Sequence, residues 1–269
     1  MISVSTFSSP QEAVRSVADE LEALIRRKAA LGKKAVLGLA TGSTPLPLYA
    51  ELIRRHREEG LSFANVVSFN LDEYEGLARD HEESYWHFMW ENLFDHLDVD
   101  PGAVHLPPGL YAAGEVAAHC QCYEEAIREA GGLDWQLLGI GRTGHIGFNE
   151  PGSEKDTRTR RVELAEVTRR DAAAAFGGIG RVPTHAVTMG VRTILEAKRV
   201  VLMAWGEKKR AILERAFTGE VGPEVPASWL QEHSNVHLVL DSAAGEGLDS
   251  ISEKNVRTRA RRPELSHSE

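Results

Sequence analysis

Short apolar runs alternate with longer amphipathic patterns along most of the chain, and this alternation restricts the fold more than any other feature. Strand-like runs fall at about 35–39, 65–69, 134–139, 199–204 and 236–240. Helical patterns lie at about 46–59, 83–96, 115–130, 188–197 and 207–217, and Ser9-Pro10 begins an earlier one. Strands that alternate with helices form crossover units, which build a parallel sheet. The sequence therefore predicts a single α/β domain, with a Rossmann-like, mostly parallel sheet and helices on both of its faces.

The most informative loop is Gly-Arg-Thr-Gly-His-Ile-Gly-Phe-Asn-Glu-Pro, residues 141–151. It follows an apolar run that ends at Ile140, so we expect it at the carboxyl end of a strand, where open α/β sheets bind ligands. His145 and Glu150 bring an imidazole and a carboxylate into this loop, and these are the side chains of a proton-transfer site. The alternative is a turn in which His145 only caps a neighbouring element.

A second predicted strand ends in small and hydroxyl-bearing residues. Thr41, Gly42, Ser43 and Thr44 follow the strand-like run, and Pro45 then opens a helical pattern. Free backbone N–H groups and the helix dipole at such a terminus bind anions. The segment lacks the lysine of a P-loop and the glycines of a dinucleotide fingerprint, so nucleotide binding is not indicated. The alternative is an ordinary capped helix.

Carboxylates follow a third predicted strand. Val66-Val-Ser-Phe69 is strand-like, and Asn70-Leu-Asp-Glu-Tyr74 comes directly after it. Asp72 and Glu73 could there supply a catalytic base, a metal ligand or a helix cap. No His/Cys cluster at metal-ligand spacing accompanies them, so the sequence predicts no metal site. Because the carboxyl ends of parallel strands meet at one edge of a sheet, we expect the three polar loops to converge.

The motifs LGLATGSTPLPLY, VSFNLDEYEGL and GHIGFNEP occur in this order, and together they resemble the glucosamine-6-phosphate deaminase family. The similarity runs over roughly residues 10–245 and includes stretches at 84–99, 183–195 and 206–219. The 6-phosphogluconolactonases are related and share the fold and a glycine-histidine loop. The FNLDEY and FNEP elements are typical of the deaminases.

The resemblance implies conversion of glucosamine 6-phosphate and water to fructose 6-phosphate and ammonia, with no cofactor. It assigns ring opening to His145, assisted by Glu150, and removal of the C2 proton to Asp72. Such acid–base steps typically contribute ~10²–10⁴-fold each. It places the phosphate at the Thr41–Thr44 loop and at Lys209, which adds a point charge.

Three features depart from the family pattern. Thr143 stands where the family has Asp or Asn before the glycine-histidine pair, and a hydroxyl cannot stabilise an imidazolium as a carboxylate does. Thr143 is therefore a candidate catalytic residue with an altered role. The family's phosphate-binding arginine falls near Ala174. Candidates to substitute for it are Arg142, Arg169 and Arg170. In allosteric members an acetylated sugar phosphate binds a serine, an arginine and a lysine. Ser153 and Arg160 match the first two, whereas Val162 stands at the position of the lysine, so the sequence does not support that regulatory site.

Composition limits the partners of the chain. Its 269 residues carry a formal net charge of −9, which argues against nucleic acid or an anionic membrane as a partner. Apolar stretches of about six residues are far shorter than the ~20 that span a bilayer, and no secretory signal is visible. Cys120 and Cys122 are too few for a disulfide framework. We expect a cytoplasmic protein that binds a small amino-sugar phosphate, and we leave a homo-oligomer open.

Residues 1–253 are predicted to form the sugar-phosphate domain, and residues 254–269, rich in arginine, are predicted to form a solvated basic tail. Three functions stay open. The first is the deaminase, or a close relative acting on another amino- or keto-sugar phosphate. The second is a non-catalytic sugar-phosphate sensor. The third is a lactonase, which would use His145 to activate water and would not need Asp72.

Overall fold

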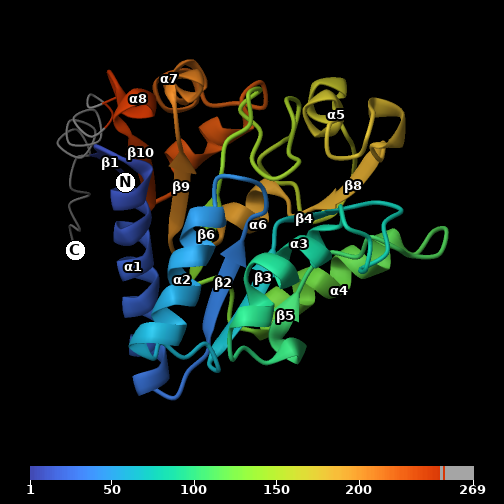
Figure 1. The fold of residues 1–269 in the computed structure, drawn as a ribbon. Helices are drawn as coiled ribbons and strands as arrows, with labels where there is room; N and C mark the ends of the chain where they lie inside the picture. Colours follow the sequence, from blue (N-terminus) through green and yellow to red (C-terminus); the bar gives the residue numbers. More distant parts are fainter. Residues whose placement is uncertain (249–250, 252–269) are drawn as a thin grey trace, which may run out of the picture.

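The computed structural model describes residues 1–248 and 251. Within them, a seven-stranded sheet runs in the order β1-β10-β9-β6-β2-β3-β5, and every neighbouring pair is parallel (Figure 1). Its strands are β1 (Ile2–Phe7), β2 (Ala35–Leu39), β3 (Val66–Asn70), β5 (Val104–His105), β6 (Trp135–Leu138), β9 (Val200–Ala204) and β10 (Val236–Asp241). The predicted parallel α/β fold is confirmed.

The helices are α1 (Pro10–Ala30), α2 (Leu46–Glu59), α3 (Tyr85–Asn92), α4 (Val116–Glu129), α5 (Glu166–Ala172), α6 (Val191–Leu195), α7 (Arg210–Thr218) and α8 (Ser242–Gly245). Most of the helices lie between strands of the main sheet, while α5 lies between β7 (Arg160–Glu163) and β8 (His185–Thr188) and α8 follows the last strand. Short 3₁₀ turns are η1 (Phe94–His96), η2 (Pro101–Ala103), η3 (Ile179–Arg181), η4 (Glu207–Lys209) and η5 (Pro226–Glu232). Right-handed crossovers in this strand order place α1 and α2 on one face of the sheet and α4 and α6 on the other. In Figure 1, α1 and α2 lie in front of the sheet.

A smaller antiparallel sheet begins directly after β3 of the main sheet. Its order is β4-β8-β7, with β4 (Asp72–Tyr74), β7 (Arg160–Glu163) and β8 (His185–Thr188). The sequence patterns did not predict this sheet. The helix expected over 188–197 is wrong at its start, because Thr188 ends β8 and pairs with both neighbouring strands. Only Val191–Leu195 is helical there.

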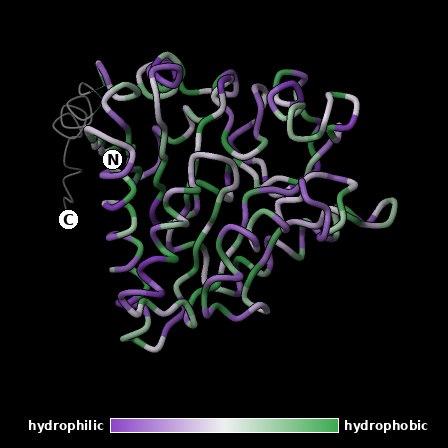
Figure 2. The backbone as a smooth tube through the Cα atoms, viewed as in Figure 1, coloured by the Kyte–Doolittle hydropathy of each residue, from purple (hydrophilic) through white to green (hydrophobic). Residues whose placement is uncertain are grey.

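The core is built from strands that are buried on both faces. Every residue of β2, β6 and β9 is buried, which is typical of parallel strands covered by helices on both sides. The helix α1 buries one face, formed by seven residues between Ala13 and Ile25, and Figure 2 shows hydrophilic and hydrophobic residues alternating along its turns. In the part of the chain that the structure describes, no helix is long and apolar enough to cross a membrane.

A second, smaller apolar cluster lies under the antiparallel sheet and contains Tyr74, Phe148, Leu164, Phe176, Val182 and Ala186. It packs α5 and the following turn against β4 and the loop that carries His145. The predicted tail, residues 254–269, and the domain end at residue 253 lie outside the described residues.

Candidate active site

The three polar loops predicted from the sequence meet in one cleft of about 780 Å³ at the carboxyl ends of the central strands. Predicted residues that line it are Thr41, Gly42, Ser43, Thr44, Asp72, His145 and Lys209. Thr143 and Glu150 do not line the cleft, but both contact His145, which does. The aromatic side chains of Tyr74, Tyr85 and Phe148 also line the cleft.

His145 and Glu150 form a hydrogen-bonded pair. The Nδ1 atom of His145 lies 3.1 Å from Oε2 of Glu150, and the two side chains are 19% and 12% exposed. Thr143 completes a triangle, because its hydroxyl donates to Glu150 Oε2 at 2.9 Å and lies 3.0 Å from His145 Nδ1. The carboxylate that Thr143 lacks is therefore supplied to the imidazole directly by Glu150.

The Glu150 carboxylate has a third partner that the sequence did not reveal. The hydroxyl of Thr168, on α5, donates to Glu150 Oε1. Burial raises the pKa of Glu150, but the hydrogen bond and charge of His145, with the hydroxyls of Thr168 and Thr143, outweigh burial and hold the pKa below its usual value. Glu150 is thus ionised at neutral pH and can stabilise a protonated imidazole.

The second ring nitrogen of His145, Nε2, lies directly against the backbone of Gly141. A Cβ atom at Gly141 would lie 2.0 Å from His145 Nε2, so only glycine permits this ring position. Because Glu150 accepts at Nδ1, the neutral ring is favoured as the Nδ1–H tautomer, which leaves a lone pair on Nε2. His145 can therefore accept or donate a proton through Nε2 in the cleft.

Asp72 and Glu73 lie in β4, whereas the sequence placed them in a loop after the third strand. Successive side chains of a strand point to opposite sides. Asp72 lines the cleft, while Glu73 accepts hydrogen bonds from the backbone nitrogens of Tyr74, Tyr85 and Trp86 at 2.8–2.9 Å. Glu73 thereby fixes the start of α3, and burial raises its pKa to about 7 despite these bonds.

The Asp72 carboxyl is buried, with 6% of the residue exposed. Burial, followed by the charge of Glu73, raises its pKa from 3.8 to about 8. Asp72 also lies close to the His145 loop, since a Cβ at Gly147 would be 3.4 Å from Asp72 Oδ2. A carboxyl with a pKa in this range can accept and return a proton near neutral pH.

The loop before α2 has the features of an anion site. Gly42 has a φ of +96°, which favours glycine, and the helix begins at Leu46, after Pro45, with no side chain capping its first turn. Pro47 has no N–H, so in this first turn the backbone N–H groups of Leu46 and Leu48 are the ones available to a ligand. Lys209 faces the same cleft, and its Nζ donates to the carbonyl of Ile140 at 2.6 Å.

The three arginines that could substitute for the family's phosphate arginine lie in different places. Arg142 lines the cleft, where it pairs with Asp171. Arg169 donates to the carbonyls of residues 179 and 182, and Arg170 pairs with Glu166. Neither Arg169 nor Arg170 lines the cleft, so Arg142 is the one arginine of the three that a ligand there could reach.

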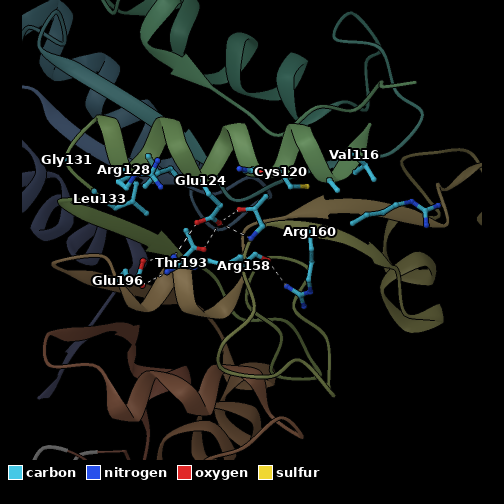
Figure 3. A pocket seen from close by; sticks show the side chains of 16 residues that line it. Val116, Cys120, Glu124, Arg128, Gly131, Leu133, Arg158, Arg160, Thr193 and Glu196 are labelled. Carbon is cyan, nitrogen blue, oxygen red and sulfur yellow. Dashed lines mark hydrogen bonds and ion pairs between the residues drawn. The ribbon is translucent and has the colours of Figure 1, made fainter. Parts of the chain in front are cut away.

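A second cavity, of about 910 Å³, lies between α4, β7 and α6 (Figure 3). It is larger than the cleft, but none of the predicted catalytic or phosphate-binding residues lines it. Its polar groups bind one another. Glu124 accepts from Thr159 and Thr193, and Arg158 pairs with Glu196. We therefore take the cleft as the candidate active site.

Arg160, from the predicted effector-binding set, lies at the edge of the second cavity. It donates to Ser153 Oγ at 3.2 Å and to Asn149 Oδ1 at 2.8 Å. Across residues 1–248 and 251, no group of three or more His, Cys, Asp or Glu side chains is placed to hold a metal ion.

Comparison with known proteins places the chain among sugar-phosphate enzymes. The family described as glucosamine-6-phosphate isomerases/6-phosphogluconolactonase matches residues 8–239. The chain belongs to this family. The resemblance found in the sequence motifs is thus confirmed.

Relatives within the family are similar over most of the chain. Glucosamine-6-phosphate deaminase 2 of Bacillus subtilis (strain 168) is 47% identical over 232 residues, which are 86% of this chain and 92% of that protein. A putative glucosamine-6-phosphate deaminase-like protein of Bacteroides thetaiotaomicron is 42% identical over 93% of this chain, which spans only 38% of that longer protein. A solved structure of a monomeric glucosamine-6-phosphate deaminase aligns with a TM-score of 0.84 at 40% identity, and covers 91% of this chain and 98% of that one.

Proposed function

We propose that this member of the family converts glucosamine 6-phosphate and water to fructose 6-phosphate and ammonia. The observation that carries the proposal is the convergence of Asp72, the His145–Glu150 pair and an anion-binding loop in one cleft. Relatives that share 42–47% of its residues and bear the deaminase name support the same activity. The substrate needs a phosphate site, a ring-opening group and a base, and the cleft offers a candidate for each.

The phosphate is proposed to bind at the Thr41–Thr44 loop and Lys209. The N-terminus of α2 offers uncapped backbone N–H groups and the positive end of a helix dipole. The ammonium of Lys209 lines the same cleft and can add a charge-assisted contact. This placement leaves the sugar ring to extend toward His145 and Asp72.

Ring opening is assigned to His145. Opening moves a proton from the anomeric hydroxyl to the ring oxygen, and the Nε2 atom can carry it because Nδ1 is held by Glu150. The carboxylate of Glu150 stabilises the imidazolium formed in between. Thr143 and Thr168 orient that carboxylate through their hydroxyls.

Proton transfer at carbon is assigned to Asp72. In its ionised form Asp72 accepts the C2 proton of the open-chain amino aldehyde, and the same carboxyl returns a proton to C1 of the enolamine. Water then adds to the resulting C2 imine, and ammonia leaves to give the ketone. The substrate ammonium favours the ionised form of Asp72, because an opposite charge stabilises a carboxylate.

The decisive experiment is an assay of ammonia and fructose 6-phosphate from glucosamine 6-phosphate with the purified chain. Formation of both products in equal amounts is expected. Binding of the sugar phosphate without turnover would instead indicate a sensor. Hydrolysis of 6-phosphogluconolactone without ammonia release from the amino sugar would indicate a lactonase.

All the groups in this scheme belong to one chain, so the proposed reaction needs no residue from a partner. A monomer such as the one named in the similar solved structure is consistent with that. We retain the expectation of a cytoplasmic enzyme, because a phosphorylated sugar is charged and does not cross a membrane unaided.

A further inference from the structure

The cleft carries more positive charge than the proposed scheme uses. Arg142, Lys208 and Lys209 all line it, and Asp171 is the carboxylate that faces them from α5. Asp72 also lines the cleft, but burial raises its pKa to about 8, so its carboxyl offsets little of this charge at neutral pH. The cleft is therefore suited to an anion with more than one negative charge.

Arg142 and Lys209 line the same cleft, and Lys209 is bonded to the backbone just before Arg142. The Lys209 ammonium donates to the carbonyl of Ile140, two residues before Arg142. Burial lowers the pKa of Lys209, the charge of Asp171 opposes this, and the charge of Arg142 lowers the pKa further. The two positive charges thus repel each other, which is unfavourable unless an anion offsets them.

The carboxylate of Asp171 offsets these two positive charges only in part. One nitrogen of the Arg142 guanidinium, Nη2, bonds to Asp171 Oδ1, and the two side chains are 63% and 45% exposed. A guanidinium has five N–H donors, and an ion pair this exposed is readily exchanged. The planar fork of arginine also fits a phosphate better than it fits one oxygen of a carboxylate.

We propose that Arg142 binds the substrate phosphate together with Lys209 and the Thr41–Thr44 loop, and that Asp171 holds Arg142 until the phosphate displaces it. This inference rests on the proposed function, since it names a further residue of the same phosphate site. In this proposal the carboxylate of Asp171 holds Arg142 at the cleft in the free protein and competes with the ligand phosphate for the guanidinium.

The test measures binding of inorganic phosphate and of fructose 6-phosphate to the full chain by calorimetry. Arg142→Gln should weaken both by about 10- to 100-fold, which corresponds to roughly 1.5–3 kcal/mol for a hydrogen bond to a charged group. Asp171→Asn should tighten both several-fold, because the competing charge is removed. Arg170→Gln is the matched control, since Arg170 pairs with Glu166 outside the cleft, and its affinities should stay near those of the wild type.

Steady-state rates separate binding from chemistry. Arg142→Gln should raise KM for glucosamine 6-phosphate while changing kcat little, and Arg142→Lys should give an intermediate KM. Unchanged affinity of Arg142→Gln for both phosphate ligands would overturn the assignment. Unchanged or weaker binding by Asp171→Asn would overturn the competition. A wild-type chain that binds fructose 6-phosphate but releases no ammonia would contradict the proposed function and leave the phosphate site standing.

Discussion

Replacing Asp72 by asparagine should stop the reaction and also stabilise the folded chain at alkaline pH. Burial, followed by the charge of Glu73, raises the Asp72 pKa from 3.8 to about 8. In the unfolded chain this carboxyl loses its proton near pH 4. A shift of about four pH units corresponds to about 5 kcal/mol of unfolding free energy, at about 1.36 kcal/mol per unit.

The direction in which the free energy of unfolding changes with pH depends on which state, folded or unfolded, binds the proton of Asp72. Between about pH 4 and pH 8 the folded state keeps a proton on Asp72 that the unfolded state has lost, so the free energy of unfolding falls as pH rises. Above about pH 8 both states are ionised and the penalty is constant. The side chain introduced by Asp72→Asn is uncharged throughout and escapes the penalty. Its stabilising effect should be small at pH 4 and grow to at most about 5 kcal/mol by pH 8.

Urea unfolding of the wild type and of Asp72→Asn at several pH values from 5 to 9 measures this difference. Asp80→Asn, on an exposed loop, is the control and should show no such pH dependence. Ammonia release and exchange of the C2 proton should both be lost in Asp72→Asn, because an amide cannot accept the proton. A stability difference that stays constant over this range would refute the burial argument. Turnover above about a tenth of the wild type would exclude Asp72 as the base, since acid–base catalysis contributes ~10²-fold or more.

Three further predictions concern the phosphate site and the support of His145. Glucosamine 6-phosphate should bind at least about 10-fold more tightly than glucosamine in calorimetry, because each charge-assisted hydrogen bond contributes roughly 1.5–3 kcal/mol; equal affinities would exclude the Thr41–Thr44 loop as the phosphate site. Thr143→Asp should move the alkaline limb of the forward pH–rate profile upward, because a second carboxylate favours the protonated imidazole, with little effect on the reverse reaction from fructose 6-phosphate. If profile and rate stay unchanged, Thr143 only completes the turn. Thr168→Val should raise the Glu150 pKa and slow ring opening, whereas Thr168→Ser should keep both; equal losses in the two variants would assign Thr168 to packing alone.

The central sheet and the position of the main loops could be predicted from local patterns. The runs 35–39 and 134–139 are rich in apolar residues, and glycine or hydroxyl-bearing residues follow or end them, so both the strands and the polar loops after them leave a clear signal. The edge at which they meet follows from parallel pairing alone. For this reason the residues expected in the site do line the cleft or, for Thr143 and Glu150, contact His145 in it.

Other features depend on contacts between distant segments and leave no local signal. The strands β4 and β7 are three and four residues long, too short for a period of two to stand out, and β7 is exposed at alternate residues. Thr168 belongs to a polar helix, and its role appears only once α5 lies over Glu150. The pKa of Asp72 likewise depends on burial and on Glu73, neither of which sequence spacing reports.

The two carboxylates of β4 are chemically similar, but neither can replace the other. Asp72 and Glu73 are neighbours that scoring schemes treat as nearly equivalent, yet the strand sends one to the cleft and the other to the backbone of α3. A protein in which the two had changed places would have the same mass, composition and charge. Its reacting carboxyl would reach one methylene further, and its helix anchor would fall one methylene short. The function of this pair therefore depends on the order of the two residues along the strand.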